Sequence, residues 1–378
     1  MLIHSTKKLL EELDIGSPLD EIESPVFSWH ANLFTLNRRK ILVLVQDRSR
    51  YVIVLHGLKK RDFKKLDSLI YEAIKDIFKE EGIDDAVSAS YLEKAGKIRF
   101  AKATDRSSIA RLVHAAEWVR IFQDDILENS MHQTPLSLRI SRVIIRLGKK
   151  SSAYVFPNEE LYKDLEEVSG KIALKCRAAI LKVTLDLEKF EVWRRLVVPL
   201  DSTYTSLHKA LQAAFGWRGY HLHEFYFYGE KDPLSEENIN HPGYHKDGYS
   251  PVLNLVSNQD AFTYPNNVEM HAEEGVRLSD LPFEHAKYNY DFGDNWQHYI
   301  EVEGVTDDFN GNHPIFLDGS GDAPPEDVGG EQGYEEFLRV MADVNDQEHE
   351  GYRHWAEGSS YQKYDPDEVK WSFMAQFR

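Results

Sequence analysis

The sequence has a single cysteine, Cys176, among its 378 residues. One thiol excludes an internal disulfide and any zinc site made of cysteines, and it is typical of a protein from a reducing compartment. Long apolar runs are also missing. The longest, Ile41–Val45 and Tyr51–Leu55, have the length of strands and are far shorter than the roughly 18 residues needed to cross a bilayer. Segment 1–14 carries acidic residues where an export signal needs an apolar stretch. We therefore expect a cytoplasmic protein without a membrane partner.

Basic charge is scarce in the second half of the chain. Segment 1–175 has a net charge of +3 and segment 176–378 a net charge of −21, which together give the −18 of the whole chain. An acidic surface repels the phosphate backbone of DNA and RNA, so nucleic acid is not an expected partner of the C-terminal half. Because the chain is also longer than most single hydrophobic cores, we predict two domains, 1–175 and 176–378.

The N-terminal half is predicted to mix strands and helices. Three short apolar runs separated by turn residues indicate a meander. They lie at 31–36, 41–46 and 51–55. Apolar residues then recur at three- and four-residue spacing from Phe63 to Phe78, and Gly82 follows them. This periodicity indicates a helix with a glycine cap, and a second helix is expected at 107–122.

The C-terminal half is predicted to contain strands around a helix that begins after Thr203. The expected strands lie at 180–187, 192–198, 221–228, 287–292 and 297–305. The segment 230–267 is rich in Gly, Asn and Pro and is expected to form long loops. The fold class that follows is α+β, with two domains, each a small, mostly antiparallel or mixed sheet packed with helices.

A basic segment at 138–150 admits two interpretations. Its apolar residues alternate with basic ones, which are Arg139, Arg142, Arg146, Lys149 and Lys150. A basic helix of this kind can touch nucleic acid or an acidic partner. It can also be a helix with a solvated basic face, and the lack of interleaved aromatic residues favours this second interpretation.

Three segments of the C-terminal half carry a resemblance. They are Trp217 with His221–Phe225, then Tyr288–His298, then Ala323–Glu335. Together and in this order they resemble the plasmid pRiA4b ORF-3-like family over about residues 178–378. The resemblance implies an association with plasmids or other mobile elements, because members are also labelled as passenger proteins of a transposable element. It implies no reaction, since no biochemical role is established for the family.

The chain departs from two properties attached to that family. Some members are labelled resolvase-like, but no serine nucleophile with supporting arginines is identifiable in this sequence. Many members carry cysteines around the Pro-Pro-Glu-Asp motif, where this chain has Leu317, Ala323 and Val328, so the resemblance implies no thiolate metal site. The N-terminal half resembles a separate family of uncharacterised bacterial domains, through Phe27–Asn32 followed by Asn37–Lys40.

Histidines and carboxylates of the three segments form a candidate site for a divalent metal. On a strand, His221 and His223 share a face, and neutral imidazoles are common metal ligands. The further candidate ligands are Asp291, Asp294 and His298, with Glu326 and Asp327 able to complete the shell. A metal held in this way can activate water for hydrolysis. The alternative is structural: in Asp291–Asp294, the carboxylates of a tight turn accept backbone N–H bonds.

The loop with Pro324 and Pro325 is a second candidate feature. It either closes over the sheet or forms a rim that presents its carboxylates to a ligand. The candidate ligand or partner surface comprises Trp296, Glu326, Asp327 and Tyr334. The favoured hypothesis is a binding module with a protein partner. Whether this module holds a divalent metal is left open. The alternatives are a metal-dependent hydrolase and, less favoured, a nucleic-acid-associated factor.

Overall fold

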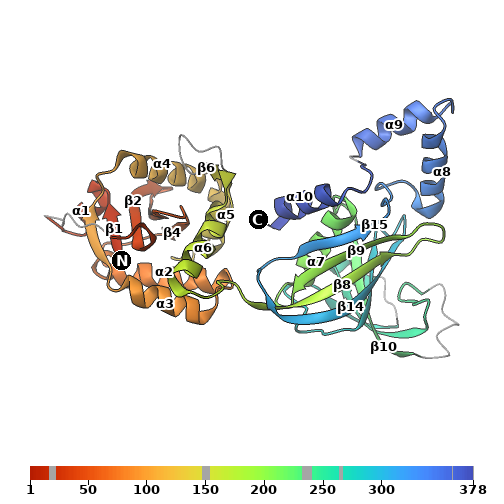
Figure 1. Cartoon of the computed structure of the whole chain (residues 1–378), viewed down its shortest axis with the longest axis horizontal. Coiled ribbons are helices and arrows are strands. Elements are labelled where there is room, and N and C mark those ends of the chain that lie inside the picture. Colours follow the sequence, from red (N-terminus) through yellow and green to blue (C-terminus); the bar gives the residue numbers. More distant parts are fainter. Residues whose placement is uncertain (17–22, 147–153, 232–240, 264–266, 360, 378) are drawn as a thin grey trace. The chain divides into compact units, whose positions relative to one another are not determined.

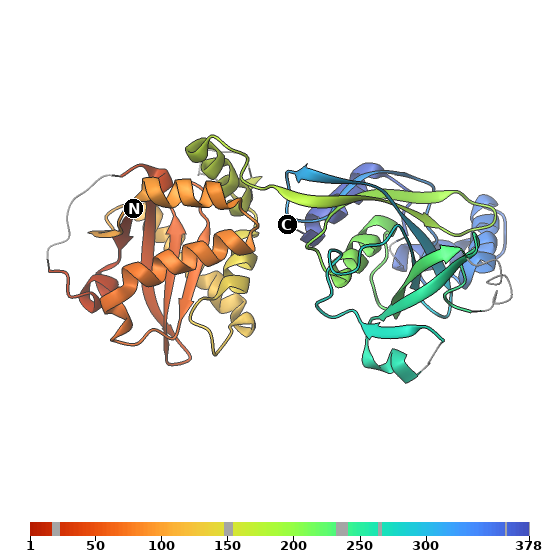
Figure 2. The ribbon, with the colours of Figure 1, turned by 90° about the horizontal axis from the view of Figure 1, so that it is seen from below.

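The chain folds as two units, Met1–Lys175 and Cys176–Arg378. The computed structural model describes residues 1–16, 23–146, 154–231, 241–263, 267–359 and 361–377, drawn as coloured ribbon in Figures 1 and 2. Each unit has its own sheet and its own hydrophobic core. The α+β prediction is therefore confirmed for both halves.

The N-terminal unit is built on a mixed five-stranded sheet in the order β4-β3-β2-β1-β5. Its strands are β1 (Leu2–Ser5), β2 (Ser28–Leu36), β3 (Arg39–Gln46), β4 (Val52–His56) and β5 (Arg99–Lys102). A short pair, β6 (Ile145–Arg146) and β7 (Tyr154–Val155), stands apart from it. Strands β2, β3 and β4 form an antiparallel meander, whereas β1 runs parallel to both of its neighbours. The predicted meander is thus present, and the sheet becomes mixed through two strands that the sequence pattern did not indicate.

Helices cover both faces of this sheet. They are α1 (Lys7–Glu12), α2 (Leu66–Glu80), α3 (Asp85–Ala95), α4 (Arg106–Ile121), α5 (Thr134–Ser141) and α6 (Pro157–Ser169). Along β3, Leu42 and Leu44 pack with α2, α3 and α6, whereas Val43 and Val45 pack with α4 and α5. Figure 1 shows α4 on one side of the strands and α2 and α3 on the other. Because both faces are buried, a central strand reads as a continuous apolar run.

The basic segment 138–150 does not form one helix. Helix α5 ends at Ser141 and the strand β6 follows, which agrees with the preference of β-branched residues such as Ile145 for extended backbone. Residues 147–153 lie outside the described part of the chain. Arg139 pairs with Asp125, and Arg142 lies 2.7 Å from the fully buried carboxylate of Glu81. These two arginines are therefore held by partners within the fold and do not form a free basic face.

The C-terminal unit is built on an eight-stranded sheet in the order β12-β11-β10-β13-β14-β8-β9-β15. Its strands are β8 (Cys176–Leu185), β9 (Val192–Pro199), β10 (His223–Lys231), β11 (Tyr249–Val256), β12 (Glu269–Ala272), β13 (His285–Tyr290), β14 (Trp296–Phe309) and β15 (Ile315–Ser320). All neighbouring strands are antiparallel except β11 and β12, which are parallel. The prediction of long loops throughout 230–267 is wrong for β11, whose strand conformation depends on pairing with β10.

In the described part of this unit, four α-helices accompany the sheet. They are α7 (Tyr204–Phe215), α8 (Gly330–Ala342), α9 (His349–Gly358) and α10 (Pro366–Phe377). Helix α7 packs its apolar side, including Leu207 and Leu211, against Phe225 and Phe227 of β10. Figure 2 shows α7 lying against one face of the strands, and α10 packs beside α7 and β15. The buried core on this face brings the ends of β10 and β13 together with the loop that precedes α8.

Candidate functional site

The pairing of β10 with β13 brings His221 and Asp291 together. The two strands are antiparallel with His223 opposite Tyr290, and the backbone N–H of Asp291 donates to the carbonyl of Leu222 over 3.0 Å. His221 stands just before β10 and Asp291 just after β13, so they lie at the same end of the ladder. The structure thus brings together two residues of the candidate cluster.

Asp291 adopts a left-handed backbone conformation, with φ of 53°. Asp is one of the few residues besides Gly that tolerates this region. One carboxylate oxygen, Oδ1, accepts the backbone N–H of Gly293 over 3.0 Å and that of Asp294 over 3.4 Å. The predicted tight turn is therefore present. The other oxygen, Oδ2, is left facing the His221 ring at 3.6 Å from Nε2.

The loop before α8 brings the third member, Asp327. The indole N–H of Trp217 donates to the carbonyl of Pro324 over 2.8 Å. The buried carboxylate of Glu326 accepts the backbone N–H of Arg218 over 3.0 Å and the hydroxyl of Tyr290. These bonds fix the loop against the strand ends. Asp327 then points its side chain towards His221 from a backbone with φ of 62°.

A further contact locks the two loops onto each other. The backbone N–H of Gly329 donates to Oδ2 of Asp294 over 3.1 Å. At Gly330, φ is 70° and an added Cβ would lie 3.1 Å from the carbonyl oxygen of Asp294. This position therefore needs glycine both for its backbone conformation and for the close approach. Asp294 holds the loop in place and its carboxylate is directed at Gly329.

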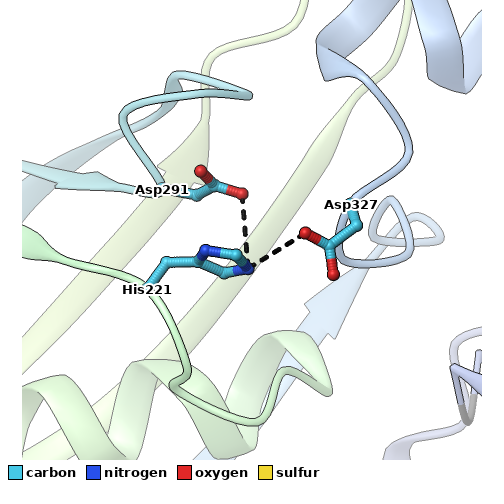
Figure 3. Close-up of side chains that lie close together, drawn as sticks. All are labelled: His221, Asp291 and Asp327. Atoms are coloured by element: carbon cyan, nitrogen blue, oxygen red, sulfur yellow. Dashed lines mark ion pairs between the residues drawn. The ribbon is translucent and has the colours of Figure 1, made fainter.

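His221, Asp291 and Asp327 form a compact cluster of potential metal ligands (Figure 3). One ligand atom from each lies within 4.8 Å of the others. Nε2 of His221 is 3.2 Å from Oδ1 of Asp327 and 3.6 Å from Oδ2 of Asp291. The Nε2 atom is itself buried, and neither contact has the geometry of a hydrogen bond. The Asp327 side chain is 66% exposed, so the cluster is open on that side.

Exposed apolar side chains flank the cluster. Tyr220 precedes His221, Leu222 follows it, and Phe292 follows Asp291; all three are exposed. Aromatic residues are enriched in protein interfaces relative to the rest of the surface. The end of the β10–β13 ladder therefore combines polar ligands with an apolar rim.

His223, unlike His221, belongs to a buried network. Its Nε2 lies 3.0 Å from Oε2 of Glu273, whose other oxygen accepts the hydroxyl of Thr205 over 3.0 Å. The His223 ring stacks on that of His208 at 3.7 Å between centroids, and Nδ1 of His208 lies 2.7 Å from the hydroxyl of Tyr288. Burial and, secondly, His223 lower the pKa of His208 to about 3. The sequence pattern gave no signal for Glu273 or His208, because their partners come from distant segments.

The other predicted site residues lie in the interior. His298 is fully buried, its Nδ1 lies 3.2 Å from the carbonyl of Tyr288, and burial lowers its pKa to about 3. Trp296 and Tyr334 are core side chains. Burial and the neighbouring Glu326 raise the pKa of Tyr290, which keeps its hydroxyl a donor to that carboxylate. The sequence predicted seven candidate metal ligands. The structure brings three of them together, His221, Asp291 and Asp327. The other four, His223, Asp294, His298 and Glu326, have other partners.

Two family profiles match the two halves of the chain. Residues 177–372 match the plasmid pRiA4b ORF-3-like protein family. Residues 2–160 match a domain of unknown function, DUF6933. Each match falls within one of the two folded units. In the part of the chain that the structure describes, no helix has the length and apolar character needed to span a membrane.

Two relatives each match about half of the chain. An uncharacterized protein, y4hQ, from Sinorhizobium fredii (strain NBRC 101917 / NGR234) is 34% identical over 185 residues, which is 48% of this chain and 81% of the relative. The crystal structure of a protein of unknown function from Methanosarcina mazei Go1 matches with 33% identity and a TM-score of 0.39. That match covers 51% of this chain and 97% of the solved one.

Proposed function

The chain belongs to the plasmid pRiA4b ORF-3-like family, and from its geometry we propose that the C-terminal domain is a binding module with a divalent cation at its recognition site. His221, Asp291 and Asp327 hold the cation. The exposed side chains of Tyr220 and Phe292 form part of the rim around it. The partner is a protein segment that supplies an oxygen ligand to the cation and an apolar side chain to the rim.

The observation that carries this proposal is the spacing around Nε2 of His221. Zinc bonds to nitrogen and oxygen are about 2.0–2.2 Å long, so two ligands of one tetrahedral ion stand about 3.4 Å apart. The two carboxylate oxygens that face Nε2 stand 3.2 and 3.6 Å from it. The buried Nε2 atom forms no hydrogen bond. One imidazole and two carboxylates are a donor set that suits zinc or manganese.

A proton on His221 competes with the cation. A protonated imidazole between Asp291 and Asp327 would form two ion pairs in the same geometry. Metal affinity that depends on a neutral imidazole and ionised carboxylates weakens as the pH falls. The proposal therefore predicts proton release on metal uptake in mildly acidic buffer.

Binding is favoured over hydrolysis because neighbouring carboxylates in the described part of the chain already accept hydrogen bonds within the fold. Three protein ligands leave a coordination position open, as catalytic zinc sites do. Metal-assisted hydrolysis also uses a group that accepts a proton from the attacking water or donates one to the leaving group. Of two neighbouring carboxylates, Glu326 accepts hydrogen bonds on both oxygens, and Asp294 accepts the backbone N–H of Gly329. An open coordination position without such a group suits a ligand from a partner.

The test is calorimetric titration of the full chain, purified without a histidine tag, with Zn²⁺, Mn²⁺ and Ni²⁺. We expect stoichiometric binding of at least one of these ions, weakened at least about tenfold in His221→Ala and in Asp327→Asn. The matched control is His354→Ala, because His354 also lies near two carboxylates, at 3.6 and 3.9 Å, but on the exposed surface of α9.

Equal affinities of the parent and His221→Ala, or no metal uptake by the parent, would remove the cation from the proposal. Turnover of p-nitrophenyl acetate or phosphate that requires both added metal and His221 would assign the site to a hydrolase instead.

A further inference from the structure

A large cavity lies in the N-terminal unit, between the sheet and its α4 and α5 side. Its volume is about 940 Å³, which is in the range of cavities that enclose small organic molecules. Strands β3 and β4 contribute Val45 and Val52, α4 contributes a row of side chains that includes Trp118, and α5 contributes Ile140. No residue of the C-terminal unit is among the described residues that line it.

The rim of this cavity is cationic. None of the described lining residues is acidic, and the basic ones are Arg50, Arg106, Arg111, His114 and Arg146. Five positive or potentially positive groups around one cavity create a positive potential that favours anions. The net charge of +3 on segment 1–175 does not account for this, because the domain carries nearly as many acidic as basic residues and places none of the acidic ones in this lining.

Three of the cavity arginines differ from their neighbours in forming no ion pair within the described residues. Within the described residues, Arg50, Arg106 and Arg111 form no ion pair, and the buried Nε of Arg50 has no hydrogen-bond partner. By contrast, Arg48 lies two residues from Arg50 and pairs with Asp164 over 2.8 Å. Burial lowers the pKa of Arg111 from its ordinary value. Arg111 donates to the hydroxyl of Ser108 over 3.4 Å. A bound anion would supply an ion-pair partner to the three guanidinium groups and an acceptor to Nε of Arg50.

The floor of the cavity is apolar. Val45, Val52, Ala115 and Ile140 belong to the hydrophobic cluster on this face of the sheet. Trp118 stacks on Phe122 with 5.4 Å between centroids and borders the same space. A fully hydrated inorganic anion gains nothing from such a floor, whereas an organic anion buries its apolar part there.

We infer that the N-terminal domain binds a small organic anion with an apolar body, whose carboxylate or phosphate head contacts Arg50 and Arg111. The guanidinium groups form charge-assisted, bidentate hydrogen bonds to either head group. The apolar body occupies the space between β3, β4 and Trp118. This site is independent of the cation cluster in the C-terminal domain, so each can fail without the other.

Two fluorescent probes of the same shape test the inference on the full chain. 8-Anilino-1-naphthalenesulfonate carries an anionic group, and N-phenyl-1-naphthylamine is its uncharged counterpart. We expect saturable binding of the sulfonate with one site per chain, and binding of the amine weaker by about tenfold, the typical contribution of one charge-assisted hydrogen bond. Displacement by octanoate or by octyl phosphate then distinguishes the two head groups.

Variants locate the site. Arg111→Gln and Arg50→Gln are each expected to weaken sulfonate binding about tenfold and to leave amine binding unchanged. Ala110→Phe, at an exposed lining position of α4, fills the cavity and should weaken both probes without perturbing the core. The control is Arg139→Gln, which removes an arginine that pairs with Asp125 outside the cavity lining.

Three outcomes would overturn the inference. Equal affinity for the two probes would show that the anionic group does not contribute to binding. Sulfonate binding that survives both Arg111→Gln and Ala110→Phe would place the probe elsewhere. Displacement of the sulfonate by a single-stranded oligonucleotide but not by octanoate or octyl phosphate would assign the basic rim to nucleic acid.

Discussion

His221 and His223 stand two residues apart, yet their imidazoles have opposite surroundings. His223 is buried and its Nε2 lies 3.0 Å from Glu273, in a network in which Thr205, Tyr288 and His208 supply further partners. His221 faces two carboxylates that stand too far away, or in the wrong direction, for hydrogen bonds. Tyr290 lies between the two groups, with its ring 5.8 Å from that of His221 and 6.2 Å from that of His208.

Residue type alone does not distinguish a structural histidine from a candidate ligand. Both clusters combine imidazole with carboxylate. The buried network has partners for the groups that it removes from water, which is the condition for a stable polar interior. The cluster at the surface keeps an unpartnered nitrogen and an exposed carboxylate, which is the condition for binding something else. The following predictions test whether this contrast holds in solution.

The largest effect is expected in the buried network. Glu273→Ala removes the partner of both His223 and Thr205, and loss of one partner from a buried pair costs about 3 kcal/mol of unfolding free energy. The measurement is urea denaturation of the C-terminal domain within the full chain. Glu274→Ala is the control, because Glu274 is the exposed neighbour and should change stability by less than about 0.5 kcal/mol. Similar urea midpoints for the two variants would show that Glu273 does not act as the partner of His223 and Thr205.

A pH effect of intermediate size is expected from His298. Burial lowers its pKa from 6.5 to about 3, so between these values the unfolded chain binds a proton that the folded chain does not. Above pH 6.5 His298 therefore does not lower the free energy of unfolding. Below pH 6.5 its effect lowers the free energy of unfolding by about 1.4 kcal/mol for each pH unit. His298→Gln should reduce the slope of unfolding free energy between pH 6 and 4 by that amount.

The exposed His354 gives the control for this slope. His354→Gln changes a histidine whose side chain is 68% exposed, so the parent slope should persist in that variant. If His298→Gln also keeps the parent slope, the result would contradict the burial and the lowered pKa of His298 in the folded chain.

The sequence predicted helices and strands well where the element buries one face, because burial of one face produces a regular spacing of apolar residues. Helix α2 was expected from apolar spacing between Phe63 and Phe78 and is present at Leu66–Glu80. The site was harder, because it depends on where a strand begins. Alternation placed His221 and His223 on one face, but β10 starts only at His223, so His221 leaves the sheet and meets Asp291. Glu273 could not be assigned to His223, since their contact depends on the pairing of β11 with β10 and β12.

The smallest effect is expected from two substitutions of Asp327, which distinguish the role of its carboxylate from the cost of its backbone conformation. Its φ is 62°, a region that costs an ordinary L-residue about 1 kcal/mol but costs glycine almost nothing. Asp327→Ala should therefore unfold more easily than Asp327→Gly by about 1 kcal/mol, whereas both variants lose the carboxylate and should lose metal affinity equally. Urea denaturation and metal titration of the same two proteins give both comparisons. Retained affinity in either variant would remove Asp327 from the ligand set, and an alanine variant as stable as the glycine variant would contradict the left-handed backbone at this position.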